Sequence, residues 1–212
     1  RSVPSPRACA VPSFDAWAAA VNISAPKLRV TDLETLRGAV ATADIAVGEE
    51  LCVVPRGRCL DLAATAAGSP CPSLAPDPLW GSLAWYEKLA LWLLAEQQQA
   101  EDSAVSGYVA YLPTKAEFAD APLEWDAEEL AELRYLPVIA AVGEQAASID
   151  QLFARLQAGG GVDAARVDVP DLRWAEQIVL SRAFSSVVRQ GSADAPPPPP
   201  AGVAARVRSP RP

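Results

Sequence analysis

The chain has 212 residues, half of them hydrophobic, and a formal net charge of −8. This length and composition predict one folded domain, or one and a half, with a hydrophobic core of its own. The acidic balance argues against a nucleic-acid partner, because phosphate groups are bound by basic surfaces, and no apolar run is long enough to cross a membrane.

Two residue types are absent, which limits the available chemistry. Without histidine, the usual Ser-His and Cys-His nucleophile arrangements are excluded. The four cysteines lack the C-x-x-C spacing of a zinc site, so we expect no metal site and passive, reduced thiols at Cys9, Cys52, Cys59 and Cys71. Methionine is missing even at position 1, which indicates a processed product or a fragment.

The first 13 residues contain arginine and serine but no acidic residue. Such a composition is typical of an organelle transit-peptide remnant, and an ordinary disordered N-terminus is the alternative for residues 1–13. A short helix is expected next, over residues 14–21, because Phe14, Trp17 and Val21 share one helical face.

Short β-prone runs follow this helix, at residues 27–30, 38–41 and 50–55. In the turn before the last run, Gly48 can adopt a positive φ and the Asp44 side chain can bond to the turn backbone. The sequence therefore predicts a small antiparallel sheet over residues 27–60, within a β-region that spans residues 14–68.

A break rich in proline and glycine follows, and the apolar spacing then changes to the three and four residues typical of core-facing helices. We expect helices over about residues 79–98, 138–157 and 171–184, and a short connector at 106–113. From residue 186 the chain is rich in proline and poor in core-forming residues, which predicts a disordered tail over residues 186–212.

An acidic run lies between two of these helices. Asp126 followed by Glu129 predicts a capped helix start that Pro137 later interrupts. A catalytic cluster of Glu128, Glu129 and Glu132 is one interpretation of the run. A solvated first helical turn is the better one, because negative charge is favourable there.

Arg182 raises a question about the last helix. It comes three residues after Val179, on the side of the helix that should face the core. An unpaired buried guanidinium is costly, so Arg182 needs either an internal acidic partner or a ligand that supplies one.

Five segments occur in an order that resembles the SET-domain lysine methyltransferases of the Rubisco large-subunit methyltransferase type. They are FDAW, LRGAVATADIAVGEELCVVP, WYEKLALWLLAEQ, SGYVAYLP followed by WDAEELAEL, and WAEQIVLSRAF. The resemblance covers roughly residues 14–185. It implies an α+β, partial SET fold, in which a small antiparallel sheet is followed by a mainly α-helical insertion within residues 69–185. It also implies S-adenosylmethionine as cofactor and methyl transfer to a lysine side chain of a protein substrate.

The resemblance also assigns site residues. In this family the backbone of a glycine-containing turn contacts the cofactor, and the matching residues here are Thr35, Leu36, Arg37 and Gly38. Leu36 stands where the family commonly has glycine. Arg182, the arginine of SRAF, would contact the cofactor carboxylate and border the substrate. Phe184 would line the lysine channel or pack in the core.

The family's remaining site residues follow SRAF: an Asn-His pair and channel tyrosines. This chain has no histidine and no tyrosine after Tyr135. We therefore expect a truncated form with no catalytic residue of its own and weak or no cofactor binding. The expected partner is the protein that carries the target lysine. We also expect a monomer, located in the chloroplast or otherwise in the cytoplasm or nucleus. A non-catalytic SET-like interaction scaffold is the alternative.

Overall fold

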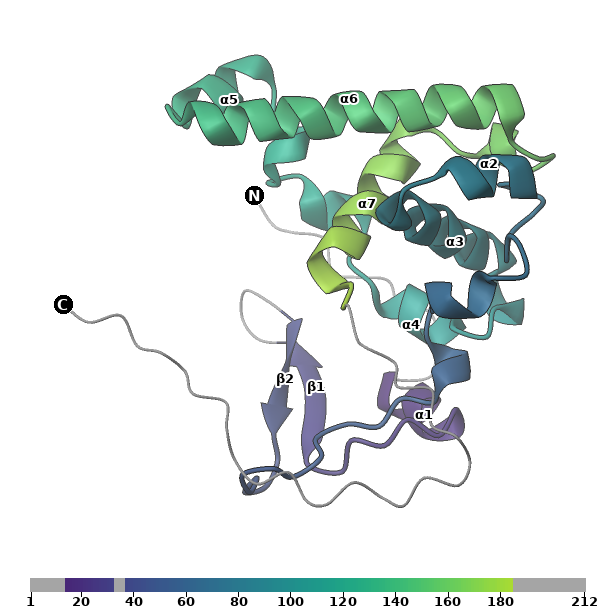
Figure 1. The fold of residues 1–212 in the computed structure, drawn as a ribbon. Coiled ribbons are helices and arrows are strands. Elements are labelled where there is room, and N and C mark those ends of the chain that lie inside the picture. The colour runs from purple at the N-terminus through teal and green to yellow at the C-terminus, as the bar shows by residue number, and fades with distance from the viewer. Residues whose placement is uncertain (1–13, 33–36, 185–212) are drawn as a thin grey trace. The chain divides into compact units, whose positions relative to one another are not determined.

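The structure, a computed structural model, describes residues 14–32 and 37–184. This part of the chain contains seven α-helices and a two-stranded antiparallel sheet, so the predicted α+β class is confirmed (Figure 1). The chain divides into a compact unit that ends at Arg182 and a second unit that begins at Ala183. The segment 1–13, the turn residues Thr35 and Leu36, and the tail 186–212 lie outside the described residues.

A hairpin follows the first helix, α1 (Phe14–Ala20), as the sequence predicts. Strands β1 (Leu28–Asp32) and β2 (Arg37–Ala41) pair with Leu28 opposite Ala41 and Asp32 opposite Arg37. The predicted turn geometry at Gly48 is confirmed, with φ of 84°. Its backbone is held by Glu49, whose carboxylate accepts a hydrogen bond from the Ala46 N–H at 2.9 Å.

The third predicted strand is wrong. Within residues 50–55, only Val53 pairs, through an isolated bridge to Ser24. Residues 50–54 are all exposed, so no apolar surface stabilises an extended strand there. Strand propensity describes a fit to a half-buried pleated surface, and without that surface it does not produce a strand.

Three helices build the core: α3 (Trp85–Gln99), α6 (Leu136–Gly159) and α7 (Val169–Arg182). Their most deeply buried side chains are Leu91, Leu93, Ile149, Leu152, Leu156, Leu172 and Ile178. Helix α7 packs mainly against α3, and α6 covers α7 (Figure 1). The helices predicted over 138–157 and 171–184 are thereby confirmed.

Two helix predictions need correction. The single helix expected over 79–98 is divided into α2 (Asp77–Ser82) and α3, because Leu83 is buried with an extended backbone. Glu87 caps the new helix start by accepting a hydrogen bond from the Ala84 N–H at 2.7 Å. The expected connector at 106–113 contains α4 (Ser106–Tyr111), which ends two residues before a proline that lacks the N–H to continue a helix.

The acidic helix start is confirmed. The Asp126 carboxylate accepts hydrogen bonds from the N–H groups of Glu128 and Glu129, at 2.8 and 2.9 Å, at the start of α5 (Ala127–Glu132). Glu129 returns a hydrogen bond to the Asp126 N–H at 2.9 Å. The acidic side chains of this turn are exposed, as expected of a solvated helix start. Pro137 lies in the first turn of α6.

Two buried carboxylates join the core helices. Glu87 on α3, 5% exposed, pairs with Arg155 on α6. Glu176 on α7, 3% exposed, accepts a hydrogen bond from the Gln145 side chain at 3.1 Å, and its second oxygen has no hydrogen-bond partner in the described chain. Burial raises the pKa of Glu176, the Gln145 hydrogen bond opposes this rise, and the nearby negative charge of Glu87 adds to it.

Replacing Gly107 with alanine is expected to separate α1 from α4. A Cβ at this buried position would lie 2.2 Å from Cγ of Trp17, so the whole indole would have to move to make room for it. Gly107→Ala should lower the free energy of unfolding by about 1–3 kcal/mol in urea denaturation. Gly143→Ala is the matched control, because nothing lies within 4 Å of its added Cβ, and it should be neutral or stabilise by up to about 1 kcal/mol. Equal effects of the two substitutions would contradict the α1–α4 contact.

The raised pKa of Glu176 predicts a pH-dependent stability. The folded state favours the protonated acid, so its contribution is fully present below the ordinary glutamate pKa of 4.5 and is lost as pH rises through the raised pKa. Glu176→Gln mimics the neutral acid and should flatten this loss in urea titrations across the pH range. Glu144→Gln, an exposed change on the same partner helix, should leave the profile unchanged. An unaltered profile in Glu176→Gln would contradict the prediction.

Candidate functional site

An open cavity of about 490 Å³ is formed by residues of the hairpin and of helices α1, α4 and α7. Its lining residues are Phe14, Val30, Gly38, Ala39, Tyr108, Tyr111, Leu112, Pro113, Glu117, Phe118 and Arg182. Its volume is within the range of sites that bind small molecules, and aromatic side chains with a few polar groups are the usual lining of such sites.

The aromatic wall of the cavity comes from α1 and α4. Tyr108 and Tyr111 are three residues apart on α4, and this spacing places them on one face of the helix. The ring of Tyr111 packs against Phe14, with 4.8 Å between the ring centroids. Gly107 allows α1 to approach α4 closely, because its missing side chain leaves room for Trp17. The contact between these two helices therefore fixes the aromatic wall.

Arg182 is the last residue of α7 and supplies a positive charge at the cavity. Its side chain is exposed, and Nη1 donates a hydrogen bond to Oγ of Ser181 at 2.6 Å. The expectation that Arg182 faces the buried side of the helix is therefore wrong. The internal salt bridge that the sequence left open is not formed within the described residues.

Tyr108 and Arg182 influence each other electrostatically. Burial raises the pKa of the Tyr108 hydroxyl, and the positive charge of Arg182 lowers it in part. The hydroxyl therefore stays protonated at neutral pH and can donate a hydrogen bond into the cavity.

The structure brings together two of the residues that the sequence resemblance assigns. Gly38, on β2, lines the cavity together with Arg182. Arg37 begins β2, with its backbone opposite Asp32. Thr35 and Leu36 fall outside the described residues. Phe184 follows α7 with its side chain 96% exposed, so the interpretation of Phe184 as a core residue is wrong.

Several cavity residues were not identified from the sequence. Tyr108 and Tyr111 lie in a segment expected to be a connector, and in a connector their three-residue spacing does not indicate a shared face. Recognising α4 as a helix would have placed both rings on one face. Phe14 reaches the cavity from a segment distant in sequence, whereas Glu117 and Phe118 come from the short turn after Pro113, and no local pattern indicates either placement.

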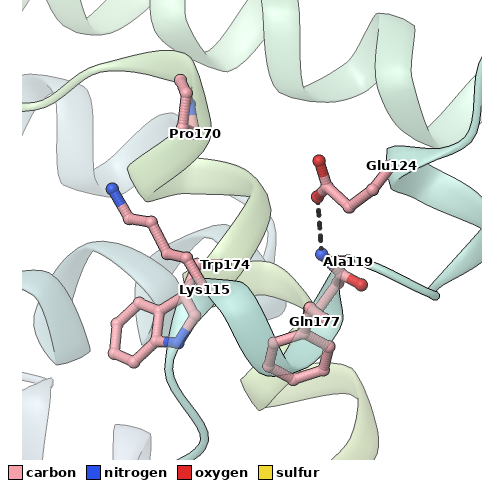
Figure 2. Close-up of a pocket in the computed structure, with 7 residues that line it drawn as sticks. Lys115, Ala119, Glu124, Pro170, Trp174 and Gln177 are labelled. Carbon is pink, nitrogen blue, oxygen red and sulfur yellow. Dashed lines mark hydrogen bonds between the residues drawn. The ribbon is translucent and has the colours of Figure 1, made fainter. Parts of the chain in front are cut away.

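A smaller cavity of about 280 Å³ lies beside α7, lined by Lys115, Phe118, Ala119, Glu124, Pro170, Trp174 and Gln177. Figure 2 shows Glu124 joined to Gln177, whose side-chain amide donates a hydrogen bond at 3.0 Å. Lys115 donates to Asp171 at 2.6 Å. Since these charged groups already have partners in the protein, we place the candidate site in the larger cavity.

Metal ligands, membrane-spanning helices and cysteines are the other features by which the described residues could indicate a site. No group of three or more potential metal ligands comes together among residues 14–32 and 37–184. Every helix in that part of the chain is too short or too polar to cross a bilayer. Cys52, Cys59 and Cys71 are free thiols, and burial raises the pKa of the Cys71 thiol.

Removing Arg182 should raise the pKa of Tyr108 further, because its positive charge favours the tyrosinate. NMR titration of ring-labelled tyrosines measures this pKa, and Tyr108→Phe identifies the signal. Arg166→Ala removes the same charge at an exposed position paired with Asp163 and should leave the titration unchanged. A Tyr108 titration that responds equally to both arginine variants would contradict the arrangement.

No family model, curated protein or solved structure matches this chain. Its function is therefore proposed from the geometry of its own residues together with the resemblance that its sequence motifs carry.

Proposed function

We propose that the larger cavity is the S-adenosylmethionine side of a protein-lysine methyltransferase site, in a chain that carries part of a SET fold. The observation that supports this proposal is the meeting of Gly38 and Arg182 at one cavity. Sequence resemblance assigns both residues to the cofactor, although one belongs to the hairpin and the other to the last described helix.

The lining residues fit the parts of this cofactor. Arg182 would pair with the carboxylate, and an exposed guanidinium at an open cavity can accept that partner without first breaking a salt bridge to another described residue. Gly38 has no side chain to keep a ligand from its backbone. The rings of Phe14, Tyr108 and Tyr111 offer apolar faces for the adenosine portion.

When bound, the cofactor supplies an electrophilic methyl group on a sulfonium. The residues of this chain would bind and orient the cofactor. The Tyr108 hydroxyl, kept protonated by the surrounding burial, would serve as a hydrogen-bond donor rather than as a base. Since the groups that align the lysine amine are not among the residues assigned here, we propose weak cofactor binding and no turnover by this chain alone.

One observation favours a scaffold function as the second candidate. Five large apolar side chains between residues 45 and 54 are exposed: Ile45, Val47, Leu51, Val53 and Val54. Exposed apolar side chains that gather into one patch are typical of an interaction site, and these five come from a single ten-residue stretch. A scaffold would have no need of the cofactor, so cofactor binding separates the two functions.

Titration with S-adenosylmethionine, followed by protein-observed NMR, tests the proposal. We expect weak binding, with shifts confined to residues that line the larger cavity. Arg182→Ala should weaken binding by about 1.5–3 kcal/mol, the contribution of a charge-assisted hydrogen bond, without changing the melting temperature of the free protein. Arg166→Ala serves as the control for lost charge.

Two results would contradict this proposal. The first is the absence of shifts at Gly38, Tyr108 and Arg182 at saturating cofactor, which would favour the scaffold. The second is a large loss of melting temperature in Arg182→Ala, which would make the arginine a structural ion rather than a ligand-binding residue.

A further inference from the structure

The N-terminal half of α6 extends beyond the helical core. The helix has 24 residues, and its fully buried side chains, Ile149, Leu152 and Leu156, all lie in the second half. In Figure 1 the end of α6 near α5 projects past α7. At this end Tyr135 is 59% exposed, Leu136 is 78% exposed and Val138 is 37% exposed. Large apolar side chains thus remain accessible where the core no longer covers the helix.

These side chains continue the apolar stripe of the core. Leu136 lies one turn before Ile139, and the stripe that begins at Ile139 runs on through Val142 and Ala146 to Ile149. Ile139 is only half-buried, Val142 is half-buried and packs against the core, and Ile149 is fully buried. A helix face of this kind is the surface that another amphipathic helix covers.

The surroundings of this face are strongly acidic. Residues 126–144, here called the α5–α6 arm, contain five carboxylates against one arginine, a net charge of −4 out of −8 for the chain. The acidic residues are Asp126, Glu128, Glu129, Glu132 and Glu144, and all five are exposed. The one arginine of the arm, Arg134, pairs with Glu132, with 3.5 Å between Nη2 and Oε2. A second copy of the chain would present the same charge and be repelled, whereas a basic partner would be attracted.

We propose that the α5–α6 arm is a docking surface for a lysine- or arginine-rich amphipathic helix of another protein. The apolar face of the partner covers Leu136 and Ile139, and its basic residues meet the surrounding carboxylates. Because the arm contributes no residue to the larger cavity, this interaction is independent of cofactor binding.

The probe is a short, fluorescein-labelled peptide of leucine and lysine, with leucines at helical spacing, measured by fluorescence anisotropy. We expect Leu136→Ser to weaken its binding roughly tenfold, because Leu136 loses its apolar contact with the peptide. Val162→Ser is the matched control, since Val162 is 86% exposed but lies outside the arm, and it should bind as the unmodified chain does. Replacing both Glu132 and Glu144 with glutamine should reduce the salt dependence of binding.

Three results would overturn the proposal. One is equal binding of the peptide by Leu136→Ser and the unmodified chain, with circular dichroism confirming that both are folded. Another is that a peptide of the same composition but scrambled leucine spacing binds as tightly as the first peptide. Binding would then depend on net charge alone and not on an apolar helix face. The third is a dimer in sedimentation analysis that Leu136→Ser converts to monomer, which would make a second copy the occupant.

Discussion

The apolar contact between α7 and α3 is the constraint on which the rest of the structure depends. It buries Leu172, Ala175 and Ile178 of α7 and fixes the axis of that helix. The indole N–H of Trp174 adds a directional link, donating to the Pro113 carbonyl at 2.7 Å. Pro113 lines the larger cavity, as does Arg182 at the end of α7. Helix packing in the core therefore determines where the charge at the cavity lies.

Buried polar groups link the core helices to one another. Glu87 uses one oxygen to cap α3 and the other to pair with Arg155, so a single side chain sets both the start of one helix and its position against α6. Glu176 is less well satisfied: within the part of the chain that the structure describes, one neutral donor bonds to it and its second oxygen has no hydrogen-bond partner. Such a group costs stability when ionised, whereas the fully paired Glu87 offsets much of its desolvation cost.

The helices with clear apolar spacing could be predicted from the sequence, and so could the cap at Asp126, because both signals are local. The break at Leu83 was missed: Gly81, a poor helix former, lies two residues before it, but the extended backbone accompanies tertiary burial of the leucine, which no local pattern shows. The prediction that Arg182 faces the core was wrong for a related reason. Its spacing from Val179 shows which face of α7 it shares, but not where along α7 the neighbouring helix stops covering that face. The sequence resemblance identifies Gly38 and Arg182, whereas the aromatic wall depends on a contact between two distant segments, α1 and α4.

The hairpin gives the two sides of the larger cavity unequal rigidity. A two-stranded sheet is marginally stable by itself, and the β2 strand with Gly38 is bonded to β1 alone among the strands described. Arg182, by contrast, extends from a helix anchored in the core. The hydrogen bonds of the hairpin therefore open at a lower free energy than those of α3 and α7. A ligand that contacts both sides must order the strand side as it binds, and the lost conformational entropy reduces its affinity.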